Sequence, residues 1–148
     1  MIKYTPRHIF MVLLAPFLMG FCLLQQGIKG KVLLQKDAMM PLKGRSTQEG
    51  KPYSTLVYIY ETISMDQLVG QNGNSVNDVK AKLIKKVQSN PNGVFKIRLR
   101  PGKYSIVLGY QDGYYIPFFS GSNGVAFVEV RKHQFHEIDL TITASSIF

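Results

Sequence analysis

The chain has 148 residues, of which 45% are hydrophobic and 18% are charged, with one cysteine and no tryptophan. This length has room for one ordinary domain and little else, and a domain of this size can bury a core without disulfides or metal ions. The 8 tyrosines, the 9 phenylalanines and the short runs of valine and isoleucine favour pleated sheets over helices.

The formal net charge is +9 and the pI is about 9.7, which raises the question of a nucleic-acid partner. The basic residues are, however, scattered over strand positions and turns, and no helical, zinc-binding or aromatic RNA-binding motif accompanies them. We therefore expect no nucleic-acid binding. A solvated basic exterior is the preferred interpretation, and a general attraction to anionic surfaces, such as lipid head groups or acidic glycans, is the alternative.

Residues 1–26 have the layout of an export signal. Lys3 and Arg7 form a positively charged start, an apolar run covers residues 9–24, and two glutamines follow. The run is short for a transmembrane helix, and Pro16 would break a long one. We therefore predict a signal helix within residues 1–26, one domain over residues 27–148, and export to the periplasm, outer membrane or cell surface of a bacterium.

Cys22 is the only cysteine and lies where a lipoprotein signal places its lipidated residue. The residues before it match such a signal loosely, because Phe21 stands where Gly or Ala is expected. Lipid attachment at Cys22, ordinary cleavage just after it and a retained anchor to the membrane all stay open. So does the simpler interpretation that Cys22 is one more apolar residue of the signal. In every case no intramolecular disulfide can form.

Seven runs of the domain are predicted as strands, and no long helix is predicted. They cover residues 27–34, 54–62, 83–89, 94–100, 103–108, 125–131 and 135–143. The clearest alternation follows the turn signal Asn92-Gly93, where Phe95, Ile97 and Leu99 alternate with basic residues. About seven short strands separated by turn signals predict an all-β fold, an antiparallel Greek-key β-sandwich.

Three details of these runs matter for the topology. The run 54–62 is apolar on both faces, which predicts a central strand. Residues 79–88 fit a helix as well as a strand, and the turn signal after them favours the strand. Pro101-Gly102 leaves two arrangements open: a hairpin in which Leu99 faces Tyr104, or strands that cross from one sheet to the other, since a Pro-Gly turn twists poorly for a tight hairpin.

The central block reads Asn92-Gly93, a Phe-led alternating strand, Pro101-Gly102, then Lys103-Tyr104 and a second alternating strand. This pattern resembles the carboxypeptidase regulatory-like family, the transthyretin-like sandwich modules of exported bacterial proteins. The segments 30–32 and 57–59 fit the earlier strands of that family. The resemblance covers most of the domain, and it implies a transthyretin-like or immunoglobulin-like sandwich that serves as a non-catalytic accessory module.

The sequence shows no catalytic constellation. Outside the signal the only histidines are His133 and His136, which are three residues apart on a predicted strand and would point to opposite faces, so a shared metal would need a bulge. The acidic residues show neither a paired-carboxylate pattern nor calcium-loop spacing. The ending 144–148 lacks the Tyr-Arg-Gly-Ser motif of related hydroxyisourate hydrolases. We expect no enzymatic activity, metal or cofactor, with a small hydrolase or metal-dependent enzyme as a remote alternative.

The candidate working surface is the aromatic segment 110–124, which ends in a Gly/Ser-rich tip. Its candidate contact residues are Tyr114, Tyr115, Phe118 and Phe119, because exposed aromatics on a rigid scaffold are typical of glycan or protein recognition. The alternative is that the last three cap the core. The predicted function is an exported, non-catalytic module that binds a protein or glycan at the cell envelope, and the alternative is a structural envelope lipoprotein without a specific ligand.

Overall fold

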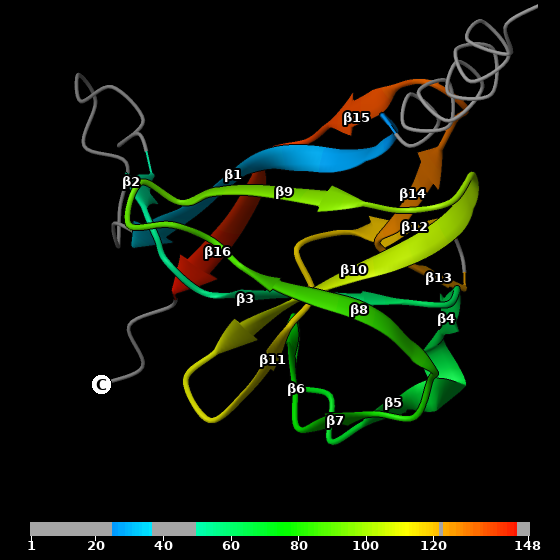
Figure 1. The fold of residues 1–148 in the computed structure, drawn as a ribbon. Coiled ribbons are helices and arrows are strands. Elements are labelled where there is room, and N and C mark those ends of the chain that lie inside the picture. The colour runs from blue at the N-terminus through cyan, green and yellow to red at the C-terminus, as the bar shows by residue number, and fades with distance from the viewer. Residues whose placement is uncertain (1–24, 37–49, 122, 145–148) are drawn as a thin grey trace, which may run out of the picture.

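The computed structural model describes residues 25–36, 50–121 and 123–144. The predicted signal up to residue 24, including Cys22, lies outside the described residues. Within the described part the regular structure is strand, apart from one 3₁₀ turn at Met65–Gln67, so the all-β prediction is confirmed (Figure 1). That part also contains no helix with the length and hydrophobicity needed to span a membrane.

The first sheet is built around β1 (Gly27–Lys36). On one edge β1 pairs antiparallel with β9 (Val94–Arg98) and β2 (Lys51–Pro52). On the other edge it pairs with β15 (Phe135–Glu137) and β16 (Leu140–Ala144), and both of these strands run parallel to it. The expectation of antiparallel pairing throughout is therefore wrong at this edge. The chain returns to the first sheet beside the start of β1, so its last two strands run in the same direction as β1.

The second sheet has the order β8 (Leu83–Gln88), β3 (Leu56–Tyr60), β10 (Gly102–Tyr110). Two strands share the far edge of β10: β14 (Phe127–Val130) pairs with its first half and β11 (Gly113–Tyr115) with its end. The apolar strand β3 lies between two neighbours, as its two-sided apolarity predicts. The ambiguous segment before Asn92 is the strand β8, as the turn signal after it predicts.

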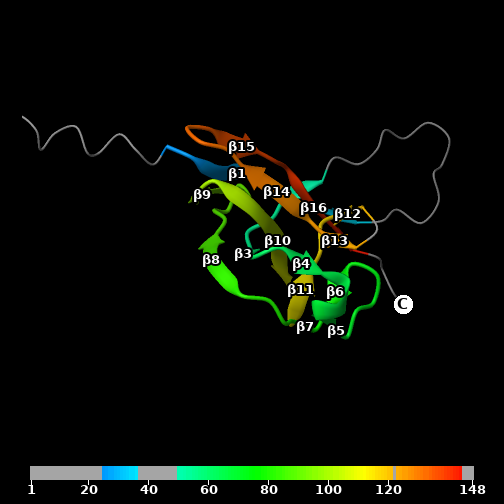
Figure 2. The ribbon, with the colours of Figure 1, turned by 90° about the vertical axis from the view of Figure 1, so that its right-hand side faces the viewer.

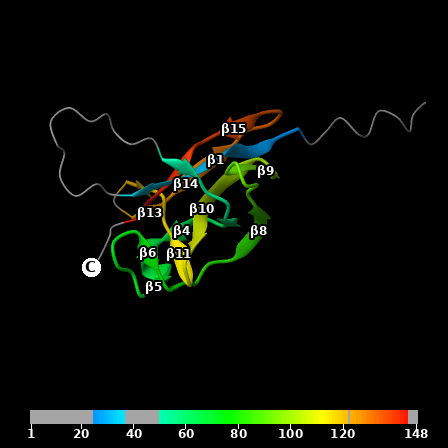
Figure 3. The same cartoon turned by 90° about the vertical axis from the view of Figure 1, so that its left-hand side faces the viewer.

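Short strands form a smaller layer beside the second sheet, and the sequence did not predict them. They are β4 (Ile63–Ser64), β5 (Leu68–Val69), β6 (Ser75–Val76), β7 (Asp78–Val79), β12 (Phe119–Ser120) and β13 (Gly124–Val125). Strand β6 extends the second sheet beyond β11, β13 pairs with both β12 and β4, and β5 pairs with β7. Figures 2 and 3 show β4, β5 and β6 at the end of the molecule away from β1 and β15.

Two of the seven predicted runs are broken, so the simple count of seven does not describe the structure. The run 125–131 divides at Ala126, whose φ of 46° lies in the left-handed region. This bend lets the chain leave β4 and join β10 as β14. The run 135–143 divides between β15 and β16, at residues 138–139. Local breaks of this kind depend on tertiary pairing, which the alternation of side chains does not encode.

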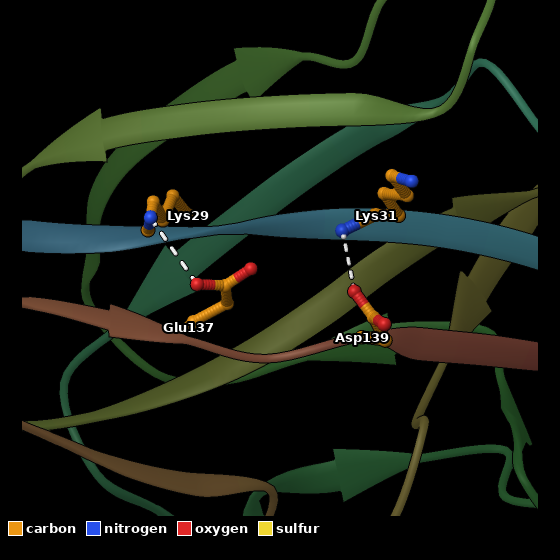
Figure 4. Close-up of polar contacts among 4 residues, drawn as sticks. All are labelled: Lys29, Lys31, Glu137 and Asp139. Atoms are coloured by element: carbon orange, nitrogen blue, oxygen red, sulfur yellow. Dashed lines mark hydrogen bonds and ion pairs between the residues drawn. The ribbon is translucent and has the colours of Figure 1, made fainter.

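A side chain bridges the break between β15 and β16 (Figure 4). The carboxylate of Asp139 accepts a hydrogen bond from the backbone N–H of Lys31 at 3.1 Å, and an ion pair of 3.2 Å joins Lys29 to Glu137 just before it. Gly30 lies opposite the break. A Cβ at this position would come within 1.7 Å of the carbonyl oxygen of Ile138, so the close approach of the two chains requires glycine.

Strands β9 and β10 belong to different sheets, which decides between the two arrangements around Pro101-Gly102. Strand β9 pairs with β1 and β10 pairs with β3, so the Pro-Gly turn carries the chain from one sheet to the other instead of closing a hairpin. The hydroxyl of Tyr104 donates a hydrogen bond to the carbonyl oxygen of Arg100 at 2.9 Å and holds the crossing in shape.

The main core lies between the two sheets. Alternate residues of both sheets meet in one cluster, among them Ile28 and Leu140 from the first sheet and Val57 and Ile106 from the second, all with no exposed surface. The alternation after Asn92 is confirmed, since β9 exposes every second side chain and buries Phe95 and Ile97. Each such burial contributes about 1.5–3 kcal/mol. A second, smaller core lies between the second sheet and the short strands.

Candidate functional site: a tyrosine cleft

A hollow of about 490 Å³ lies beside the end of β10, and we call it the tyrosine cleft. The start of β3 forms one wall, the β10–β11 hairpin forms the other, and the end of β8 contributes one residue. The lining residues are Tyr53, Ser54, Thr55, Leu56, Tyr58, Gln88, Gly109, Tyr110, Gln111, Asp112, Gly113 and Tyr114. Four tyrosines with neutral polar groups between them give the cleft an amphipathic lining.

The tyrosine rings are held by contacts with one another. Tyr53 meets Tyr110 edge to face with ring centroids 6.2 Å apart, and Tyr58 meets Tyr114 in the same way at 5.2 Å. Behind the cleft Tyr110 also contacts the buried Tyr115, with centroids 6.0 Å apart. Such pairs contribute about 0.5–1.5 kcal/mol each beyond the area that they bury. The rings are therefore positioned before any ligand arrives.

A buried serine fixes the wall that β3 provides. Ser89, only 1% exposed, accepts a hydrogen bond from the N–H of Thr55 at 2.8 Å through its hydroxyl, and its carbonyl oxygen accepts one from the hydroxyl of Ser54, also at 2.8 Å. The side chain of Thr55 in turn donates to the carbonyl oxygen of Gly109 in the opposite wall. These bonds join both walls of the cleft. The four tyrosines are half-buried: Tyr53 and Tyr110 pack against the main core, and Tyr58 and Tyr114 pack against the second core.

The rim of the cleft carries a strained residue. Tyr110 pairs with Gly113 across a two-residue turn made of Gln111 and Asp112, and Gln111 has a φ of 52°. A non-glycine residue in this left-handed region costs of order 1–3 kcal/mol, and such positions cluster at functional sites. Both turn residues are exposed. The hairpin therefore presents an amide and a carboxylate at the edge of the tyrosine rings.

The electrostatic character of the cleft is nearly neutral. Asp112 is the one charged side chain among the lining residues. Burial, and then the neighbouring Tyr114, raise the pKa of Tyr58 above its ordinary value, and the same two causes raise the pKa of Tyr60 behind it. Both hydroxyls stay protonated over the physiological range. The cleft thus offers hydrogen-bond donors and acceptors beside apolar ring faces, an arrangement that suits a neutral polar ligand.

The four predicted contact residues divide between core and surface. Tyr114 lines the cleft. Tyr115 is 6% exposed, and its hydroxyl accepts a hydrogen bond from the N–H of Thr143 at 3.0 Å, so this side chain belongs to the core. Phe118 is half-buried and contacts both clusters of the core. Phe119 is 40% exposed and lies in β12, outside the cleft lining.

The two histidines of the domain are exposed and lie near the start of β15. His136 is in the strand, opposite Ile28, whereas His133 precedes it with a φ of 60°. Over residues 25–36, 50–121 and 123–144, no three histidine, cysteine or acidic residues gather as a metal-binding group.

Comparison with known proteins adds no assignment: no family model and no curated protein matches this chain. The resemblance of residues 92–104 to the carboxypeptidase regulatory-like family therefore stays a prediction from the sequence.

Proposed function

We propose that this chain is an exported, non-catalytic module that binds a glycan in the tyrosine cleft. The observation that carries the proposal is the set of four tyrosine rings, fixed in place, with Gln88, Gln111 and Asp112 around them. Sugar rings present C–H faces that stack on aromatic rings and hydroxyl groups that bond to amides and carboxylates. A cleft of about 490 Å³ is within the ordinary range for small-ligand sites.

The cellular part of the proposal depends on the N-terminal sequence. A basic start followed by an apolar run predicts export, and a bacterial envelope supplies abundant glycans. We further propose that the two sheets form a Greek-key β-sandwich of the carboxypeptidase regulatory-like kind, with the N-terminal segment as a signal or a membrane anchor. The pattern around Pro101-Gly102 and the shared core of the two sheets support this fold.

A protein partner is the second candidate, and a separate surface favours it. Strand β8 pairs only with β3 among the described strands, so its other edge is open to an added strand. Its start is also apolar on the surface, because Leu83 and Ile84 are 43% and 38% exposed. A protein that adds a strand here would leave the tyrosine cleft free. Substitutions in the cleft should therefore weaken glycan binding and leave the binding of such a protein unchanged.

Binding to an array of bacterial envelope glycans, followed by calorimetry with each glycan that binds, tests the first proposal. Tyr114→Ala removes a ring of the cleft and is expected to weaken binding by roughly tenfold or more, since truncating an aromatic anchor of a binding site typically costs more than about 1 kcal/mol. Phe119→Ala is the matched control, because it removes an exposed aromatic ring outside the cleft. Equal affinities of the two variants, or no glycan bound by the folded chain, would contradict glycan recognition in the cleft.

A further inference from the structure

The chain enters the domain at a buried polar residue. Gln26 is 5% exposed. Its carbonyl oxygen accepts a hydrogen bond from the N–H of Leu99 at 3.2 Å, and its side-chain oxygen accepts one from the N–H of His133 at 3.0 Å. Leu99 follows β9 and His133 precedes β15. The start of the domain is therefore clamped between two loops that are far apart in the sequence.

Both loops carry exposed cations around this entry point. The segment 98–103 contributes Arg98, Arg100 and Lys103, and the segment 131–132 contributes Arg131 and Lys132. Arg98 lies directly opposite Gly27 in the β1–β9 pair, and Lys103 lies opposite Glu129 in the β10–β14 pair. These five cations, which we call the basic collar, lie on or next to the two loops that bond to Gln26, where the chain enters the fold.

The charge of the collar is little compensated. Glu129 lies 3.7 Å from Arg131, and both side chains are well exposed. The other acidic neighbour, Glu137, pairs with Lys29 at 3.2 Å. Within the described parts of the chain the remaining four collar residues take part in no ion pair. A surface with this excess of positive charge attracts anions.

The apolar run of the sequence ends at Leu24, two residues before Gln26. Two extended residues span at most about 7 Å, which is shorter than the Debye length of about 8 Å at physiological ionic strength. If the run lies in a bilayer, the collar is therefore within electrostatic reach of the head groups. Clusters of Lys and Arg next to a membrane segment bind anionic lipids, each contributing to the attraction.

The tyrosine cleft lies at the opposite end of the same strand. Strand β10 begins at Gly102, within the collar, and ends at Tyr110, in the lining of the cleft. Its nine residues span about 26 Å at roughly 3.3 Å per residue. A domain that contacts the membrane through the collar would hold the cleft well away from the lipid surface and open to ligands.

We propose that the basic collar docks the domain on the anionic head groups of a lipid bilayer. The inference goes beyond the proposed glycan binding; it rests on the membrane association of the N-terminal segment, and it does not depend on the ligand of the cleft. The position of the collar next to the apolar run favours a bilayer over a soluble polyanion, because a soluble polyanion would gain nothing from that position.

Hydrogen exchange of the full chain in lipid vesicles tests this proposal. In vesicles that contain phosphatidylglycerol, amide exchange in segments 98–103 and 131–134 is expected to be at least roughly tenfold slower than in pure phosphatidylcholine vesicles. High salt should remove the difference, since the attraction is screened. The cleft segment 110–114 should exchange at the same rate in both kinds of vesicle.

Two variants that remove equal charge sharpen the test. The collar variant Arg98→Gln, Arg100→Gln, Lys103→Gln, Lys132→Gln should lose the protection. The control variant Lys36→Gln, Lys51→Gln, Lys80→Gln, Lys86→Gln removes as many charges elsewhere and should keep it.

Equal exchange in both kinds of vesicle, an equal loss of protection in both variants, or protection of the wild-type collar by dextran sulfate but not by phosphatidylglycerol vesicles would each overturn the inference. Glycan binding measured on the same vesicles reports on the cleft separately, so a failure of one proposal is distinguishable from a failure of the other.

Discussion

The carboxylate of Asp139 accepts a hydrogen bond from the backbone N–H of Lys31, a residue 108 positions earlier in the chain. In a parallel pair of strands the acceptor at this place is ordinarily a backbone carbonyl. Between the end of β15 and the start of β16 the acceptor is instead the side chain of Asp139. The series of hydrogen bonds along β1 therefore continues across the break. The first and last parts of the domain are joined on both sides of this bond.

Removing this acceptor should weaken the junction. Asp139→Ala is expected to lower the free energy of unfolding by about 0.5–1.5 kcal/mol, the usual net value of one hydrogen bond. Asp139→Asn keeps an acceptor oxygen and should cost less. Urea denaturation of both variants checks this expectation, and equal losses for the two would show that the side-chain oxygen contributes nothing to the junction.

Gly30→Ala should disrupt the same region much more severely. The added Cβ would meet the carbonyl oxygen of Ile138 at 1.7 Å, so the two chain segments would have to separate. We expect a loss of about 3 kcal/mol or more, or failure to fold. Gly73→Ala is the control, because its Cβ meets nothing within 4 Å and only its φ of 60° is unfavourable, which costs about 1–2 kcal/mol. Similar melting temperatures of the two variants would refute the steric argument.

Substitutions in the aromatic segment 110–124 should lower the free energy of unfolding strongly at the buried Tyr115 and weakly at the exposed Phe119. Tyr115→Phe loses the bond to the N–H of Thr143 and should cost about 1 kcal/mol, whereas Tyr115→Ala should cost about 3–5 kcal/mol because it also empties a buried site. Phe119→Ala should change the free energy of unfolding by about 0.5 kcal/mol or less, since the ring is largely on the surface. Thermal unfolding measures all three. A large loss for Phe119→Ala would assign that ring to the core.

Alkaline pH should destabilise the domain through Tyr60. Burial, and then Tyr114, hold the pKa of this hydroxyl above its ordinary value of 10.0, whereas the unfolded chain ionises near that value. The stabilisation is therefore fully present below about pH 10 and is lost as the pH rises from there toward the raised pKa. Tyr60→Phe should flatten this decline. Chemical denaturation at pH 9 and pH 11 checks it, and identical declines in both proteins would contradict it.

Side-chain periodicity predicts the parts of this fold that are locally encoded. The alternation around Phe95 and Ile97 identifies β9 and its buried face, and the two-sided apolarity of residues 56–60 identifies a central strand. Periodicity does not say which strands pair. The parallel return of β15 and β16 along β1, and the break at Ala126, depend on contacts between residues far apart in the sequence.

The sequence predicts only two of the four tyrosines of the cleft, because the other two come from a wall that is distant in the sequence. Tyr110 and Tyr114 belong to the aromatic segment that the composition singles out, but Tyr53 and Tyr58 come from the opposite wall. In the sequence Tyr58 is indistinguishable from the strand residues around it. Its ring faces away from the main core because its neighbours Val57 and Ile59 face into it. That alternation gives the one signal by which Tyr58 could have been assigned to another surface.

The parallel pairing of β1 with β15 and β16 also orders events in time. Strand β1 is synthesised first, and its parallel partners β15 and β16 lie 108 residues later in the sequence. The first sheet cannot be completed until residue 144 has been synthesised, and contacts across so long a stretch of chain form slowly. A channel that admits only unfolded polypeptide requires the chain to stay unfolded until it has crossed. If the chain is exported through such a channel, the late pairing of β1 with β15 and β16 helps to keep it unfolded, and the first sheet is completed only after export.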